Sequence, residues 1–242
     1  MKIIQSSVFL SSLVSEVSSG SMMPAAMQRP YVWHKADVEA LCDSILSGFP
    51  VGSFLTWAPG NCADLSNLSR GRLGPIVGLV NSHPSTQLLL DGQNRLASLA
   101  WMMNQDLPEM DDASEAERAT WLSGERLVLD FETRSIKFVP EAEANLNFRL
   151  PVWSVFNTMM TPAMSLLRLR TKQWMESYSE EASDAVIDFW NDCRSRFQDA
   201  RTTLTIIDGA TPEEARHAFL RISRVGVPMS QEDFDYALGW KA

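Results

Sequence analysis

The chain has 242 residues, of which 45% are hydrophobic and 21% charged, and its formal net charge is −9. This composition excludes a disordered chain, and the length suits one large domain or two small ones. The acidic balance argues against a surface dedicated to coating DNA, although a local basic groove stays open as an alternative.

The amino-terminal stretch MKIIQSSVFLSSLVSEV is partly apolar, but Gln5, several serines and Glu16 interrupt it. No clean cleavage site follows, so we expect no signal peptide. No run reaches the roughly 18 apolar residues of a membrane span, so we expect no membrane partner. Cys42, Cys62 and Cys193 have neither metal-ligand spacing nor the even number of a disulfide framework, which favours a cytoplasmic location.

The first expected elements are a short helix over 8–18 and a helix over 34–48. In the second helix apolar residues, among them Cys42, recur at three- and four-residue spacing, and Gly48 is a typical stop signal. The pattern VGSFLTW then indicates a strand, and residues 58–75 form a loop rich in Gly, Asn and Ser.

Two strands, PIVGLV and TQLLLD, precede an expected helix over 92–104. The buried stripe expected for this helix is Leu96, Leu99, Ala100 and Met103. An acidic loop follows over 105–112, and Ser114 with Glu117 forms a capping box for a short helix. The pattern RLVLDFETRSIKFV predicts a β-hairpin.

From residue 161 the pattern becomes mainly helical, with Thr161-Pro162 starting one helix. A second helix is expected over 180–200, with Cys193 in its apolar stripe. The other members expected in that stripe are Ala182, Ala185, Val186, Phe189, Trp190 and Phe197. The strand TTLTIID, a helix capped by TPEE, a VGVP turn and a last helix from Ser230 complete the chain.

These elements predict an α+β fold, with an α/β part over 1–150 and a mainly helical part over 151–242. The chain has no internal repeat and no linker that separates independent units, so we expect one domain over 1–242.

The segment Asp91–Arg95, of sequence DGQNR, lies where a strand feeds a helix. On the structural interpretation Asp91 is the N-cap of the helix and Gly92 allows a tight turn. On the functional interpretation the helix amino terminus binds a phosphate, Arg95 points out of the core stripe onto its oxygens, and Asp91 holds Mg²⁺ through water. Spacing alone favours the structural interpretation.

Two further segments admit both interpretations. QRPYVW, residues 28–33, offers polar groups and the flat rings of Tyr31 and Trp33 to a ligand or to the protein core. FLRISRVGVPMSQEDF, residues 219–234, is a helix-turn-helix whose second helix is acidic, which argues against reading of the DNA major groove.

Several other chemistries lack their motifs. The sequence has no GxxxxGK[ST] or GxGxxG phosphate loop and no GxSxG nucleophile elbow. The histidines, His34, His83 and His217, lie far apart, so the pattern favours surface or packing roles over metal binding.

Taken in order, QRPYVW, FPVGSFLTW, LLLDGQNRLASL and AFLRISRVGVPMSQEDF resemble the N-terminal domain of GmrSD-type modification-dependent restriction systems. The resemblance covers about residues 8–240. It implies a ParB/sulfiredoxin-like fold and a module that binds nucleoside triphosphates with Mg²⁺ and hydrolyses them, in control of DNA cleavage against phage.

The resemblance also assigns site residues. Asp91, Gln93 and Arg95 are expected to be catalytic, with Asp91 as the metal ligand. The expected nucleotide-binding residues are Gln28, Arg29, Trp33, Gly92, Asn94 and Ser223. These residues of the 28–33 and 91–95 segments are expected to line one pocket, with Ser223 and residues 215–238 near it.

Two positions depart from the family pattern, and they argue against hydrolysis more than against binding. Asn94 stands where a second glutamine is common, and Ser223 stands where an asparagine is usual. The usual nuclease domain is absent, so the protein acts alone, acts with a separate nuclease subunit, or is cut from a longer chain. Two functional alternatives stay open: a nuclease acting through the ParB-like domain itself, and a catalytically silent adaptor for protein or DNA.

Overall fold

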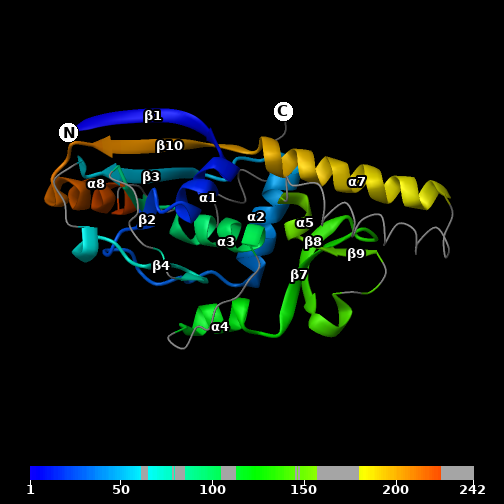
Figure 1. Cartoon of the computed structure of the whole chain (residues 1–242). Coiled ribbons are helices and arrows are strands. Elements are labelled where there is room, and N and C mark those ends of the chain that lie inside the picture. The colour runs from blue at the N-terminus through cyan, green and yellow to red at the C-terminus, as the bar shows by residue number, and fades with distance from the viewer. Residues whose placement is uncertain are drawn as a thin grey trace, which may run out of the picture.

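The computed structural model describes residues 1–60, 65–77, 79, 85–104, 113–144, 146, 148–156 and 180–224. Within these ranges the chain is a mixed α+β structure with a five-stranded, a three-stranded and a two-stranded sheet. Figure 1 shows the five-stranded sheet at one end of the molecule and the three-stranded sheet at the other. No helix in the described ranges is long and apolar enough to cross a membrane.

The five-stranded sheet combines strands from both halves of the chain. In spatial order its strands are β1 (Lys2–Phe9), β10 (Arg201–Asp208), β3 (Ser53–Ala58), β6 (Gln87–Asp91) and β2 (Met22–Pro24). β10 pairs antiparallel with β1 and parallel with β3, while β6 pairs antiparallel with β3 and parallel with β2. A strand from the second half of the chain thus lies between two strands from the first half (Figure 1).

The strand directions bring three segments together at one end of this sheet. Because β2 runs parallel to β6, the chain after Pro24 leaves the sheet near the end of β6 at Asp91. Because β3 runs antiparallel to β6, it begins at the same end, with Leu55 opposite Asp91. Helix α3 (Gln93–Asn104) follows β6 directly. The loop after β2, the start of β3 and the amino terminus of α3 therefore meet.

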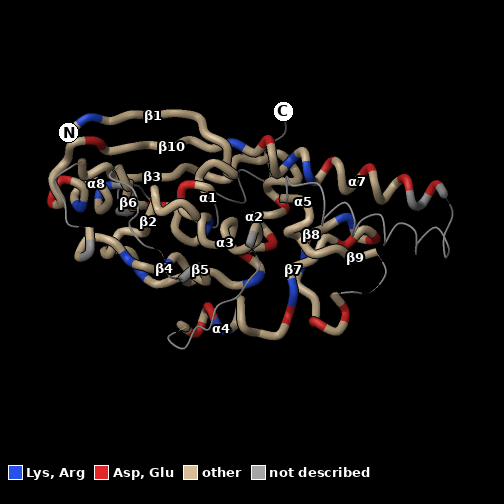
Figure 2. The backbone as a smooth tube through the Cα atoms, in the orientation of Figure 1, with Lys and Arg blue, Asp and Glu red and all other residues tan. Residues whose placement is uncertain are grey.

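Apolar stripes join several helices to one face of this sheet in a single hydrophobic cluster. They are α1 (Leu10–Ser18), α2 (Lys35–Ser47), α3, α5 (Trp153–Phe156) and α7 (Glu180–Asp199). Figure 2 shows that acidic residues predominate along α7, which contributes to the negative net charge. Phe54, Leu89 and Leu204 of the sheet are buried in the same cluster as these helices. Burial of this cluster is the main driving force for the fold.

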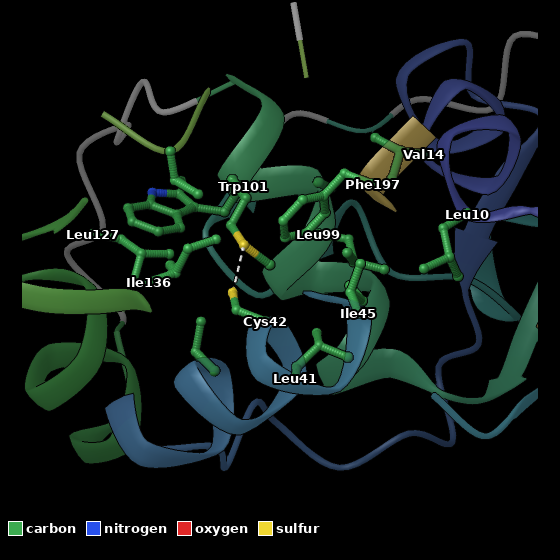
Figure 3. Packing of buried hydrophobic residues seen from close by; sticks show 14 of the residues in the cluster. Leu10, Val14, Leu41, Cys42, Ile45, Leu99, Trp101, Leu127, Ile136 and Phe197 are labelled. Carbon is green, nitrogen blue, oxygen red and sulfur yellow. Dashed lines mark hydrogen bonds between the residues drawn. The ribbon is translucent and has the colours of Figure 1, made fainter. Parts of the chain in front are cut away.

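Figure 3 shows how the cluster joins distant parts of the chain, with Leu41 and Ile45 of α2 beside Leu99 of α3. Cys42 and Cys193 are both buried, as expected for small core residues. The Cys42 thiol lies 3.4 Å from the sulfur of Met102 on α3. Burial raises the pKa of both thiols, which keeps them protonated.

The opposite face of the sheet is covered by α8 (Pro212–Arg224). Leu55 and Trp57 of β3 alternate with Phe54 and so point to this side, where they pack with Ala215. The expected cap of α8 is confirmed: the Thr211 amide donates to Glu214 Oε2 at 2.8 Å, and the Glu214 amide donates to Thr211 Oγ1 at 3.2 Å.

A smaller sheet lies beyond α2 and shares the main hydrophobic cluster. Its strands, in spatial order, are β8 (Ser135–Pro140), β7 (Glu125–Asp130) and β9 (Arg149–Pro151). The chain reaches it through α4 (Glu115–Trp121), whose expected Ser114–Glu117 capping box is present. The remaining elements are β4 (Arg72–Leu73), β5 (Ile76–Val77) and the 3₁₀ turns Leu65–Asn67 and Glu141–Glu143.

Most expected elements are confirmed, including the hairpin and the helices over 34–48, 92–104 and 180–200. Three details were wrong. Residues 2–9 form β1, so the first helix starts later than expected, at Leu10. The strand expected over 75–80 is shorter among the described residues, where it spans Ile76–Val77 as β5 and Leu79 lies outside any strand. Ala185 is exposed, and the buried residues among the described side chains of its helix are Val186, Trp190, Cys193 and Phe197.

Several expectations lie outside the described residues. They are the acidic loop over 105–112, the helix starting at Thr161, the VGVP turn and the helix from Ser230. Cys62 and His83 also lie outside them, as do the side chains of Ala182 and Ser223.

Candidate functional site

The meeting point of β2, β3, β6 and α3 contains a cavity of about 210 Å³, which we call the Asp91 cavity. Its lining confirms that the two polar segments share one pocket. The residues that line it are Gln28, Arg29, Trp33, Asp91, Gly92, Gln93, Asn94 and Arg95.

The turn from β6 into α3 requires a glycine. Gly92 has φ +94°, a left-handed conformation that side chains disfavour. A Cβ at this position would lie 2.4 Å from Cδ1 of Phe54, so the backbone also packs too closely for any side chain. Gly92 therefore allows the start of α3 to pack against β3 at the edge of the cavity.

Asp91 does not cap the helix, contrary to expectation. It is the last residue of β6 and lies opposite Leu55 in the ladder. The first turn of α3 instead closes on Gly92, whose carbonyl accepts from the Leu96 amide at 2.9 Å. The Asp91 carboxylate is therefore free of a capping role, and its side chain is 47% exposed.

Polar side chains fasten the 28–33 segment over the end of β6. Buried Gln28 donates from Nε2 to the carbonyl oxygens of Leu89 and Leu90, which continues the β2–β6 pairing with a side chain. The Val32 amide donates to Asn94 Oδ1 at 3.3 Å. Gln28 and Asn94 thus fix the walls of the cavity.

Gln93 joins the two walls and is itself only 8% exposed. Its Nε2 donates to the Arg29 carbonyl at 3.1 Å, which fixes the orientation of the amide. Among the described residues, Oε1 of Gln93 is buried and has no hydrogen-bond partner. A buried acceptor in this state costs about 1–3 kcal/mol, and such groups concentrate at functional sites.

Arg95 is more firmly held than expected. Its Nη1 donates to the Val51 carbonyl at 2.6 Å and its Nη2 donates to the Ser53 carbonyl at 2.8 Å. The guanidinium lies 4.9 Å from the ring centre of Phe54, and its side chain is 19% exposed. Burial lowers the pKa of Arg95, while Asp91 at 3.6 Å raises it. The group stays cationic and ties the start of β3 to α3.

Arg29 and Trp33 complete the cavity in different ways. Arg29 is exposed, and within the described part of the chain its guanidinium makes no ion pair. Trp33 is half-buried and packs against the main core with part of its ring. Tyr31 of the same segment belongs to the core, because its hydroxyl lies 2.9 Å from Ser98 Oγ and its ring packs on Trp121.

Sequence reasoning missed a second cavity, which we call the Arg70 cavity. It measures about 260 Å³ and shares Gln93 with the Asp91 cavity. Its charged lining residues are Arg70, Arg72 and Glu117. The two arginines in the SRGRLG loop were the available signal, but nothing in the sequence places this loop beside α4.

Most of the chain matches one known protein family. Residues 10–235 match the model of the GmrSD restriction endonuclease N-terminal domain, which includes every residue of the Asp91 cavity. No curated protein matches the chain. Since the match spans most of the sequence, the chain belongs to the GmrSD restriction endonuclease N-terminal domain family, which indicates a component of a restriction and phage-defence system.

Proposed function

We propose that the Asp91 cavity binds the polyphosphate of a nucleoside triphosphate together with Mg²⁺, and that binding and hydrolysis regulate DNA cleavage in the restriction system. The observation that carries the proposal is the convergence of a helix amino terminus, an open arginine and a carboxylate on one cavity.

The amino terminus of α3 suits an anion. The Leu96 amide is bonded to Gly92, and the amides of Gln93, Asn94 and Arg95 precede it without a partner inside the helix. These donors and the helix dipole favour phosphate oxygens. Arg29 adds a charge that has no ion pair among the described residues, and Arg95 adds a second charge at the cavity wall.

The residues present also fit Mg²⁺ in company with a triphosphate. Mg²⁺ in such sites takes one or two carboxylates, with phosphate oxygens and waters as its other ligands. Asp91 supplies one exposed carboxylate at the cavity. When bound, the ion would neutralise charge on the phosphates. Asp91 would hold the ion, while the nearby Arg95 partly balances the negative charge of the Asp91 carboxylate.

Three residues extend the proposal to hydrolysis. We assign Asp91, Gln93 and Arg95 the catalytic roles that the family pattern implies, with Gln93 orienting the attacking water. Asn94, which departs from the usual glutamine, is long enough to hold Val32 in place. The role of Ser223 and a ParB/sulfiredoxin-like ancestry of the fold remain parts of the same proposal.

The adaptor alternative gains one supporting observation, since occlusion of Arg95 is what a silent site would produce. Arg95 is indeed mostly buried against Val51 and Ser53. Arg29 argues the other way, because an exposed arginine beside a helix amino terminus keeps the cavity cationic. The nuclease alternative calls for clustered carboxylates, and among the described residues no group of three potential metal ligands occurs.

Calorimetric titration of the chain with ATP, GTP, CTP and UTP, each with and without Mg²⁺, tests the proposal. We expect saturable binding of at least one triphosphate that Mg²⁺ strengthens, followed by release of phosphate. A folded chain that binds none of the four would contradict the proposal and leave the adaptor role.

A further inference from the structure

The Asp91 cavity alone is smaller than the sites that usually hold a whole nucleotide. Sites for drug-sized ligands and cofactors usually measure about 300–1,000 Å³. The Asp91 cavity measures about 210 Å³ and the Arg70 cavity about 260 Å³. Each alone lies below that range, and only the two together reach it.

The two cavities adjoin at one side chain. Gln93 lines both of them, and its hydrogen bond to the Arg29 carbonyl places its amide beneath the 28–33 segment. Arg29 and Trp33 of that segment face the Asp91 cavity, whereas Pro30 and Tyr31 face the Arg70 cavity. A ligand that crosses the segment at Gln93 would therefore occupy both.

The Arg70 cavity has one charge that its neighbours do not neutralise. Arg72 pairs with Glu117 at 2.6 Å, and the other oxygen of Glu117 accepts from the Ser114 amide at 2.8 Å. Arg70 donates from Nε to the Ala26 carbonyl at 3.2 Å. Within the described residues Arg70 has no ion pair, so its outer nitrogens are donors available to a ligand. Figure 2 shows the basic residues at β4, the strand that contains Arg72.

The lining suits a sugar and base better than a second phosphate group. Glu117 is 4% exposed and adds a negative charge that a phosphate would have to approach. Pro30, which is exposed, offers apolar surface next to the polar groups. A nucleoside combines flat apolar faces with oxygen and nitrogen acceptors, and an arginine is a common donor to such acceptors.

We propose that the Arg70 cavity is the nucleoside subsite, so that a nucleoside triphosphate lies across Gln93 with its phosphates in the Asp91 cavity and its sugar and base beside Arg70. This inference rests on the proposed function of the Asp91 cavity. On this proposal Arg70 raises the affinity only for ligands that contain a nucleoside, and it does not contribute to binding of the phosphates.

Calorimetry with inorganic tripolyphosphate and the four nucleoside triphosphates, all with Mg²⁺, separates the two subsites. We expect the preferred nucleoside triphosphate to bind the unmodified chain at least about tenfold more tightly than tripolyphosphate. Arg70→Ala should remove that preference and leave tripolyphosphate affinity unchanged. Arg126→Ala is the matched control, because Arg126 pairs with Glu141 on the surface of the small sheet.

Two outcomes would overturn the subsite. If Arg70→Ala lowers the affinity for tripolyphosphate and for the nucleoside triphosphate equally, a phosphate lies in the Arg70 cavity. If the folded variant keeps the preference for the nucleoside triphosphate over tripolyphosphate, the cavity has only a structural role. Arg70→Gln serves if the alanine variant melts early, since its amide can replace the bond to Ala26. If the unmodified chain binds neither ligand, the proposed function itself fails, and the subsite fails with it.

Discussion

The charged residues around Asp130 and those around Asp91 differ in how completely the protein satisfies them. Asp130 ends β7 in the small sheet and is 1% exposed. Its Oδ1 accepts from the amide and hydroxyl of Thr133, both at 3.0 Å. Its Oδ2 accepts from Arg149 at 2.9 Å and from Lys137 at 3.0 Å. Every hydrogen-bonding position of this carboxylate is used within the fold.

Asp91 also ends a strand, but its surroundings leave groups unmatched. Its side chain is about half exposed, and its ion pair with Arg95 is long, at 3.6 Å. Nearby, Arg29 has no ion pair among the described residues, and Gln93 Oε1 has no described donor. A strand-end aspartate beside arginines therefore does not by itself identify a site. Unmatched polar groups around a cavity are the more useful indicator, because a ligand can complete their hydrogen bonds.

The largest effect should come from breaking the satisfied cluster. Asp130→Ala leaves Arg149 and Lys137 without their buried partner, so we expect a loss of about 3 kcal/mol of unfolding free energy. Thermal and urea unfolding would measure it, while nucleotide affinity stays unchanged. A loss below about 1 kcal/mol would mean that the cluster contributes no more than a surface pair.

The contrast also shows what the sequence could predict. Helices such as α2 and α3 follow from apolar periodicity, and the sequence predicts that the 28–33 and 91–95 segments line one pocket, as they do. Strand β1 was missed because it is mostly exposed and lacks a buried alternation. It becomes a strand by pairing with β10, about 200 residues away.

The role of Arg95 was missed for a similar reason. Its partners are backbone carbonyls of Val51 and Ser53, which carry no side-chain signal in the sequence. Only the antiparallel pairing of β3 with β6 brings them to α3. The Asp130 cluster likewise assembles from three strands and a turn, so its members show no common spacing along the chain.

The second prediction concerns Arg29, the exposed arginine of the Asp91 cavity. Arg29→Ala should weaken nucleoside triphosphate binding by about ten- to a hundredfold, because a charge-assisted phosphate contact is lost. Stability should change by no more than about 0.5 kcal/mol, since Arg29 is exposed. Calorimetry and thermal melts of the same samples measure both quantities. Unchanged affinity would place the phosphates elsewhere.

A third prediction concerns Arg95, which combines the features of both clusters. Arg95→Ala should lower stability by about 1–2 kcal/mol, because two hydrogen bonds to backbone carbonyls disappear, and it should also weaken triphosphate binding. Arg95→Lys keeps the charge but not the paired donors. We therefore expect the lysine variant to recover binding more than stability. Recovery of stability without binding would contradict this division of roles.

The last prediction is the pH dependence of the Asp130 cluster. Although burial raises the pKa of Asp130, hydrogen bonds from Thr133, Arg149 and Lys137 lower it well below its ordinary value. The folded state thus binds the proton more weakly than the unfolded chain, whose aspartates have a pKa of about 3.9. The stabilisation is complete above that pH and is lost as the pH falls towards the folded pKa.

Asp130→Asn cannot titrate, and its amide oxygen can still accept from Thr133. The difference in melting temperature between the unmodified chain and Asp130→Asn should therefore be largest above pH 5 and shrink below about pH 4. Asp192→Asn is the control, because Asp192 pairs with Arg196 on the exposed surface of α7 and should show a small difference at every pH. A gap for Asp130→Asn that stays constant down to pH 2 would show that packing, and not the charge of Asp130, stabilises the small sheet.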